Sequence, residues 1–149
     1  MKDMNVPSAD GGTQHEDVTE RIIGCAIRIH RALGPGFLEI IYHRAMAHEL
    51  RKAELPFNEE APMQVIYDGV ILGDYFADFL VARHVVVEIK AVTALTTAHE
   101  IQLVNYLNAV RFDLGLLINF GGRRIDVKRK YRQHAPRLSS LHVPHVTPV

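Results

Sequence analysis

The spacing of apolar residues predicts two helices in the first third of the chain. From Thr19 to Leu33 apolar side chains recur at helical spacing, and Gly34–Gly36 should end that helix because proline cannot continue it. A second helix is expected from Phe37 to Ala53. The predicted core positions are Ile22, Ile23, Ala26, Ile27, His30 and Leu33 on the first helix, and Leu38, Ile41, Ala45 and Leu50 on the second.

Shorter apolar runs predict strands. Pro56–Pro62 is interpreted as a connection, followed by a strand at Met63–Tyr67. Asp68-Gly69 is a strong hairpin signal, so a further strand is expected at Val70–Leu72. Later runs predict a buried strand at Phe112–Asn119 and a more polar one at Arg124–Lys130.

A third helix is predicted from about Ala98 to Val110, with Thr96 or Thr97 as its N-cap. Two more strands are expected between Tyr75 and Val92, so the order is two helices, four strands, one helix and two strands. A helix that crosses between two apolar strands indicates a layered α/β domain. The core candidates on the third helix are Ile101, Leu103, Val104 and Leu107.

The segment Tyr75–Val92, YFADFLVARHVVVEIKAV, combines apolar strands with charges. The strand after the connection Ala82–His84 is almost wholly apolar, yet it carries Glu88 and Lys90, which share a face because strand side chains alternate. Asp78 lies in an equally apolar context on the preceding strand. A connection of odd length puts Asp78 opposite Glu88 or Lys90 on the same face, and a two-residue turn puts them on opposite faces.

Charges buried in such a strand are costly unless they are paired, bound to a metal or placed at an open cleft. One interpretation is a structural pair of Glu88 and Lys90, closed by Asp78. The other is a functional site, and the strand pattern alone leaves both open.

Composition predicts one globular domain. The chain has 149 residues, of which 48% are apolar, and Cys25 is its only cysteine, expected as a small core residue. No run approaches the ~20 apolar residues of a membrane span, and the start has no signal-peptide core. We therefore expect a cytoplasmic protein with a domain at 18–132, between a disordered leader at 1–17 and a flexible tail at 133–149.

Basic residues cluster near the end of the domain although the net charge is zero. Such a cluster suits phosphate binding, and it equally suits an edge strand that is protected from aggregation by its charges. A homodimer would double the basic surface, but the sequence does not predict one. The candidate nucleic-acid-binding residues are Arg123, Arg124, Lys128, Arg129 and Lys130.

The histidines do not predict a metal pair. His43 and His48 are five positions apart, which does not match the spacing of a helical pair. His99 is expected to be solvated at a helix start, and His30 is expected to be a core residue more than a cleft residue.

The charged strands carry the residue types that metal-assisted phosphodiester hydrolysis needs. Mg²⁺ prefers oxygen ligands, which Asp78, Glu88 and the Ile89 carbonyl can supply. Lys90 can position the attacking water or stabilise developing charge. Glu39 can hold a water of the same metal or a second ion, although its place in a first helical turn also has a purely electrostatic explanation.

Three motifs together resemble known nucleases. Asp78 followed by Glu88-Ile89-Lys90 is similar to the D…ExK core of the PD-(D/E)XK nuclease superfamily. Gln102 to Tyr106, QLVNY, resembles the QxxxY element of its RecB-like branch, and Gly36 to Tyr42, GFLEIIY, matches the signature of the GxxExxY family. The stretches HRALGPGFLE, VVVEIKAV and LGLLINF also resemble that family, and the likeness spans about Val18 to Tyr131.

This resemblance implies a restriction-endonuclease-like α/β core with a mixed sheet flanked by helices and with Mg²⁺ or Mn²⁺ as cofactor. It implies Asp78, Glu88 and Lys90 as active-site residues. Glu39, Gln102 and Tyr106 are implied in support. Ala77 stands where the superfamily has proline, a residue that does no chemistry.

The leading hypothesis is a Mg²⁺-dependent nuclease that hydrolyses phosphodiester bonds, with DNA as the expected substrate. The alternative is a non-catalytic module of the same fold that binds nucleic acid or a protein through the basic cluster. A third interpretation is a purely structural charged cluster.

Overall fold

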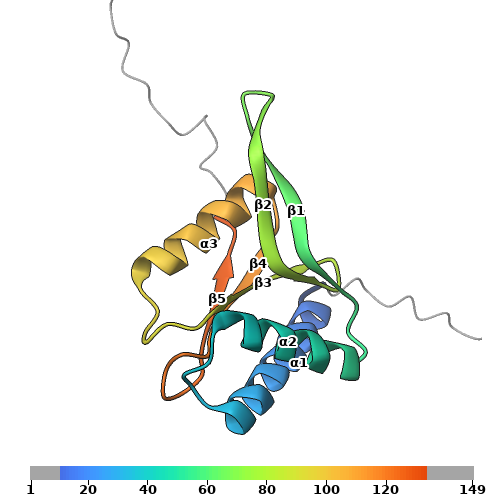
Figure 1. Cartoon of the computed structure of the whole chain (residues 1–149). Coiled ribbons are helices and arrows are strands. Elements are labelled where there is room, and N and C mark those ends of the chain that lie inside the picture. Colours follow the sequence, from blue (N-terminus) through green and yellow to red (C-terminus); the bar gives the residue numbers. More distant parts are fainter. Residues whose placement is uncertain (1–10, 134–149) are drawn as a thin grey trace, which may run out of the picture.

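The protein folds into a five-stranded mixed sheet with helices on both faces (Figure 1). The computed structural model describes residues 11–133, and the side chains of residues 17–133. The strands follow the order β1-β2-β3-β4-β5, in which only the pair β3 and β4 is parallel. The predicted α/β class, with a mixed sheet flanked by helices, is therefore confirmed.

The helices are α1 (Gly11–Leu33), α2 (Glu39–Lys52) and α3 (Thr97–Val110), and the strands are β1 (Phe57–Tyr67), β2 (Val70–Val81), β3 (Val85–Lys90), β4 (Leu114–Asn119) and β5 (Asp126–Tyr131).

Alternation along β3 distributes its side chains between two cores. Val85, Val87 and Ile89 pack with the buried residues of α1 and α2. Val86 packs on the opposite face with α3, through Leu103 and other residues of that layer. Glu88 and Lys90 share the parity of Val86, so the charged positions lie on the face that α3 covers.

Strand β2 changes direction at Asp78. Ala77 packs in the core under α3, whereas Phe79, two positions later, packs in the core under α1 and α2. From Phe79 to Val81, β2 pairs with both β1 and β3. From Val70 to Ala77 it pairs, among the described strands, with β1 alone. The upper halves of β1 and β2 therefore project from the domain as a two-stranded arm (Figure 1).

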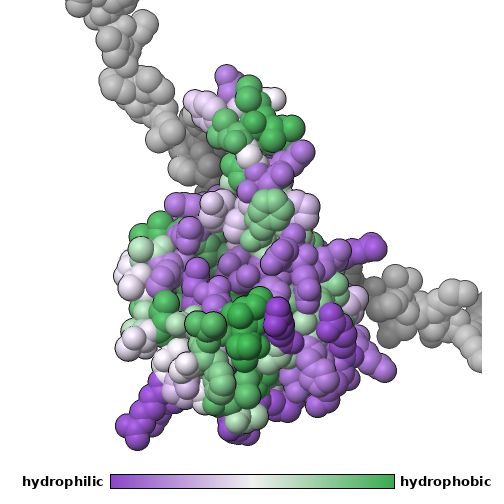
Figure 2. Space-filling view, in the orientation of Figure 1, coloured by the Kyte–Doolittle hydropathy of each residue, from purple (hydrophilic) through white to green (hydrophobic). Residues whose placement is uncertain are grey.

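The arm ends in the predicted hairpin turn. Asp68 and Gly69 have φ angles of 52° and 73°, the positive values that a two-residue hairpin turn requires. Figure 2 shows apolar side chains gathered at its tip. The exposed apolar residues beside the turn are Ile66, Tyr67, Val70, Ile71 and Leu72.

Two strand predictions were wrong. β1 begins at Phe57, so Pro56–Pro62 is not a plain connection; Pro62 is accommodated because β1 is an edge strand. Val70–Leu72 and the strand from Tyr75 form one continuous β2, in which Gly73 pairs with Val65, so the sheet has one strand fewer than expected.

The helix predictions need correction in their bounds. Helix α1 begins at Gly11 and not at Thr19, so Gly11–Asp17 of the expected leader is helical. The rest of the expected leader, and residues 134–149 of the expected tail, lie outside the described residues. Among the helices of residues 11–133, none combines the length and the hydrophobicity that a membrane crossing needs.

The buried faces of the helices are also rotated relative to the prediction. Leu33, Leu38, Ile41 and Ile101 are exposed, and Leu38 precedes helix α2 as its N-cap. Of the remaining predicted positions, Ile23, Ile27, His30, Ala45 and Val104 are half-buried. The described residues that the helices do bury are Thr19, Ile22, Cys25, Ala26 and Ile29 on α1, Tyr42, His43, Met46, Ala47 and Leu50 on α2, and Leu103 and Leu107 on α3.

Candidate active site

Asp78, Glu88 and Lys90 come together where β2 separates from β3. The connection Ala82–His84 is odd in length, and β2 pairs with β3 through Phe79 with Val87. Continued by one step, this register places Asp78 opposite Glu88. Of the two predicted arrangements, the one in which an odd-length connection puts Asp78 on the face of Glu88 is therefore correct. The carboxylates of Asp78 and Glu88 belong to one site.

The Asp78 side chain takes the place of a strand partner. The backbone N–H of Ile89 donates to Asp78 Oδ2 at 2.7 Å, at the point where β2 no longer pairs with β3. The other oxygen, Oδ1, lies 3.6 Å from His43 Nδ1 of α2. Asp78 is thus held from two sides, by the sheet and by the helical layer.

Glu88 is a half-buried carboxylate with a perturbed pKa. Burial and then the charge of Asp78 raise the pKa of Glu88 to about 8, against the lowering effects of the Tyr75 hydrogen bond and of Lys90. The Tyr75 hydroxyl donates to Glu88 Oε1. Burial, followed by the charge of Glu88, also raises the pKa of Tyr75.

Helix α3 supplies the opposite wall of the site. Gln102 and Tyr106 lie four positions apart on one face of α3, and both line a pocket of about 160 Å³ with Glu88 and Lys90. The ring of Tyr106 stacks on Tyr75, with ring centres 3.9 Å apart and an angle of 11° between the rings. The structure therefore brings five of the six predicted catalytic residues to this part of the sheet.

The start of α3 is fixed by a reciprocal cap. The Thr96 side chain accepts from the His99 backbone N–H, and the His99 ring accepts from the Thr96 backbone N–H at 3.0 Å. His99 also lines the pocket with Glu88 and Lys90. His99 thus lies at the start of the helix, as predicted, and in addition caps it and faces the pocket.

Glu39, the sixth residue, lies exposed on the first turn of α2. Within the described side chains, no three His, Cys, Asp or Glu residues gather closely enough to hold a metal ion, so Glu39 does not complete a cluster with Asp78 and Glu88. His43, four positions after Glu39, is the α2 residue near Asp78. The spacing puts Glu39 on the same helix face, one turn earlier.

The conformation of the segment Gly34–Tyr42 explains its residue pattern. Gly36 has a φ of 108°, which residues with a Cβ rarely adopt. Tyr42 is fully buried, stacks on Phe120 and donates to the Gly34 carbonyl at 2.6 Å. Its hydroxyl also accepts from the Phe37 N–H. Tyr42 thus fixes the turn that sets where α2 and Glu39 begin.

A buried amide fixes the loop at the end of β3. Asn119 Oδ1 accepts from Val92 N–H at 3.0 Å and from Gly121 N–H, and its Nδ2 donates to the Val92 carbonyl at 2.9 Å. His30 of α1 bonds Gly122 O at 3.0 Å. Because Asn119 pairs with Lys90 in the parallel ladder, this loop and the arginines that follow it lie at the same sheet end as the site.

The predicted nucleic-acid-binding residues divide into two groups. Lys128 lies 3.7 Å from Asp126, and Lys130 pairs with Glu100 of α3 at 2.6 Å. Among the described residues, no carboxylate lies within ion-pair distance of the other members of the set, Arg123, Arg124 and Arg129.

Sequence reasoning missed three residues of the site. Tyr75 carried no usable signal, because regular alternation places it on the face opposite Asp78, and it reaches the α3 face only because the alternation of β2 is interrupted at Asp78. Asn119 carried a usable signal, because it is a polar residue at the end of the apolar run LGLLIN. His43 was considered only with His48, and no spacing in the sequence connects it to Asp78.

The sequence was compared with known families. The model of the PD-(D/E)XK nuclease superfamily matches residues 16–131. The chain belongs to the PD-(D/E)XK nuclease superfamily. The superfamily predicted from the sequence is therefore confirmed, and with it the restriction-endonuclease-like fold.

A solved structure shares this fold. The crystal structure of SSO0001 aligns with a TM-score of 0.53 and 18% sequence identity, over 83% of this chain and 63% of that protein. The chain thus spans less than two thirds of that protein's length. A comparison with curated proteins found no match.

Proposed function

We propose that this superfamily member is a Mg²⁺- or Mn²⁺-dependent nuclease of the GxxExxY family that hydrolyses DNA phosphodiester bonds. The observation that carries this proposal is the convergence of Asp78, Glu88 and Lys90 at one sheet position, faced by Gln102 and Tyr106 of α3. The GFLEIIY segment, with its positive φ at Gly36 and its anchoring Tyr42, supports the family assignment.

The donor set fits a hard divalent cation. Two carboxylates lie close enough for the charge of Asp78 to raise the pKa of Glu88, a repulsion that a bound cation would relieve. Asp78, Glu88 and the Ile89 carbonyl would hold the ion, with Glu39 reaching it through water. When bound, the ion supplies an activated water and neutralises charge on the phosphate.

The chain's own residues have distinct parts in this proposal. The Ile89 N–H and His43 hold the Asp78 carboxylate in place, and Tyr75 holds Glu88. Lys90, on the same strand face as Glu88, orients the water and stabilises negative charge at the phosphate. Gln102 and Tyr106 limit the volume above these groups, so that a phosphodiester is held against them.

Metal binding and cleavage test the proposal together. Titration calorimetry should detect Mg²⁺ or Mn²⁺ binding to the wild type and none to Asp78→Asn. The wild type should cleave DNA in a single-turnover assay, and Lys90→Ala should bind the metal without cutting. Equal cleavage by Lys90→Ala would contradict its catalytic role.

A binding module without catalysis is the second candidate. Arg123, Arg124 and Arg129, which have no carboxylate partner among the described residues, favour it, because free guanidinium groups suit phosphates. Salt-dependent DNA binding without cleavage would support this candidate. In both cases we place the protein in the cytoplasm, in keeping with its buried free Cys25, and a homodimer would double its basic surface.

A further inference from the structure

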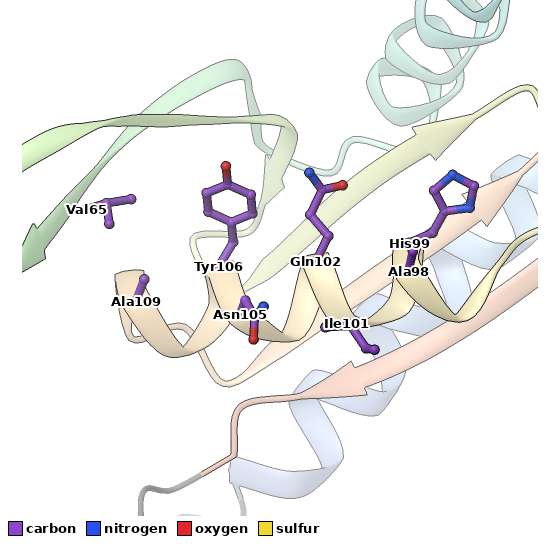
Figure 3. A pocket seen from close by; sticks show the side chains of 8 residues that line it. All are labelled: Val65, Ala98, His99, Ile101, Gln102, Asn105, Tyr106 and Ala109. Carbon is purple, nitrogen blue, oxygen red and sulfur yellow. The ribbon is translucent and has the colours of Figure 1, made fainter.

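A larger groove runs along α3 beside the catalytic pocket (Figure 3). It has a volume of about 700 Å³, and its walls include Val65 of the arm and Ala98, Ile101 and Ala109 of α3. Within the described part of the chain, no Asp, Glu, Lys or Arg lines it. The groove therefore suits an uncharged, largely apolar group.

The groove and the catalytic pocket adjoin each other. His99, Gln102 and Tyr106 line both of them. A molecule that places its phosphate at Glu88 and Lys90 would therefore have its next part above α3. In a nucleic acid the part adjoining the phosphate is a nucleoside, whose flat base is uncharged.

The walls offer the two contacts that a base uses. The ring of Tyr106 already stacks on Tyr75, and a base would extend this stack on the groove side. Gln102 and Asn105 both add an exposed amide to the lining, and their side chains extend in different directions from α3 (Figure 3). Amides supply both donors and acceptors to the edge of an unpaired base.

The arm beside the groove disfavours a second strand. Its parts of β1 and β2, beyond Asp78, carry Asp74, and the turn between them adds Asp68. They contain no Lys or Arg. A duplex that lay across α3 would bring its second strand toward an arm that carries negative and no positive charge, whereas a single strand avoids that repulsion.

We infer that the groove formed by Val65, Ala98, Ile101, Asn105, Tyr106 and Ala109 binds the bases of an unpaired strand next to the scissile phosphate. The substrate is accordingly a single strand, or an end whose strands have separated. This inference rests on the proposed nuclease function for its reaction, but base binding can be measured without cleavage.

The experiment measures binding by fluorescence anisotropy in EDTA, where metal-dependent cleavage is absent. Three labelled probes are compared: a thymidine strand of about ten nucleotides, a strand of equal length with abasic units, and the corresponding duplex. The wild type should bind the thymidine strand about tenfold more tightly than either of the others.

The variant Ile101→Glu places a carboxylate in the groove and should lose this preference for bases. Ile71→Glu at the tip of the arm is the matched control, because Ile71 and Ile101 are similarly exposed, at 57% and 54%. The control should keep the preference. Equal binding of the abasic and thymidine strands, or equal losses in the two variants, would overturn the inference.

A parallel cleavage assay with Mg²⁺ separates the two proposals. Cleavage that does not depend on bases or on Ile101 would leave the nuclease function standing and overturn the base groove. Base-dependent binding without any cleavage would leave the groove standing and overturn the nuclease function.

Discussion

At the scale of single residues, Asp78 joins the fold to the proposed chemistry. Its carboxylate accepts the Ile89 N–H where β2 leaves β3, and it lies beside Glu88. A carboxylate that replaces a ladder partner is fixed before any ligand arrives. Preorganisation of this kind lowers the cost of binding a cation, because little side-chain freedom remains to be lost.

The raised pKa of Glu88 predicts how stability depends on pH. The folded protein holds a proton on Glu88 up to about pH 8, whereas the unfolded chain releases it near 4.5. The native state thus binds more protons between these values, so the free energy of unfolding falls as the pH rises through this window.

Urea denaturation in EDTA across this pH range would measure the effect. Glu88→Gln should flatten the pH dependence, since it removes the titrating group, and Mg²⁺ should weaken it in the wild type by stabilising the ionised form. A pH dependence that is identical in Glu88→Gln would contradict the assignment.

Gly121 predicts a strong steric effect. A Cβ at Gly121 would lie 2.3 Å from the Val92 carbonyl oxygen, a backbone atom that cannot move aside cheaply. We expect Gly121→Ala to lower the free energy of unfolding by about 1–3 kcal/mol in urea denaturation. Gly73→Ala is the control, because nothing lies within 4 Å of its added Cβ. An equal effect of both substitutions would contradict the steric explanation.

At the scale of elements, α3 has three faces with three tasks. Leu103 and Leu107 pack on the sheet, and Gln102 and Tyr106 line the pocket with Glu88 and Lys90. Its outer side forms the larger groove with Ile101. A shift of α3 by one turn would disturb all three, so the cap that fixes its start matters to the site.

Thr96→Ala should remove that cap and destabilise the protein by about 1 kcal/mol. The substitution deletes the hydroxyl that accepts from the His99 N–H, and thermal or urea denaturation would measure the loss. Thr97→Ala, one residue later, is the matched control and should change stability by less than about 0.5 kcal/mol. The reverse ranking would contradict the role of Thr96.

The elements also show which parts of the fold the sequence predicts. The run at Val85–Ile89 predicted β3 correctly and Asp68-Gly69 predicted the hairpin turn correctly, because alternation and turn chemistry are local. The faces of α1 and α2 were misjudged, since apolar residues such as Leu38 and Ile41 surround these helices and only packing selects the buried ones. Local alternation placed Glu88 and Lys90 on one face but left the face of Asp78 open, so only the family resemblance grouped the three. Neither found His43, which reaches Asp78 through tertiary packing.

At the scale of the whole molecule, charge is separated across the sheet. The arm of β1 and β2 is acidic, and the segment around β5, at the opposite edge, is basic. The zero net charge is therefore the sum of an acidic surface on the arm and a basic surface around β5. The basic one continues into the loop at the end of β4, beside the carboxyl end of β3.

Neutralising this loop should weaken DNA binding in a salt-dependent manner. For Arg123→Ala with Arg124→Ala, the slope of log K against log salt should decrease by about one for each phosphate that the protein no longer neutralises. Lys130→Ala is the comparison and should change the slope less, since Glu100 already pairs with Lys130 at 2.6 Å. Anisotropy titrations at several salt concentrations measure both slopes. A larger change in Lys130→Ala would contradict this division.

The sheet order, which follows the sequence order, has a consequence for synthesis on the ribosome. The residues proposed for metal binding and catalysis on the sheet and α3 all come from one continuous stretch, Asp78 to Tyr106. Each β-strand pairs with its neighbour in the sequence. The pairing of β2 with β3, which brings Asp78 to Glu88, closes over the short connection Ala82–His84, whereas the pairing of β3 with β4 closes over the crossover that contains α3. The site can therefore begin to assemble while the chain is still emerging from the ribosome. The strands β4 and β5 are synthesised later, and β4 then pairs with β3 and β5 with β4.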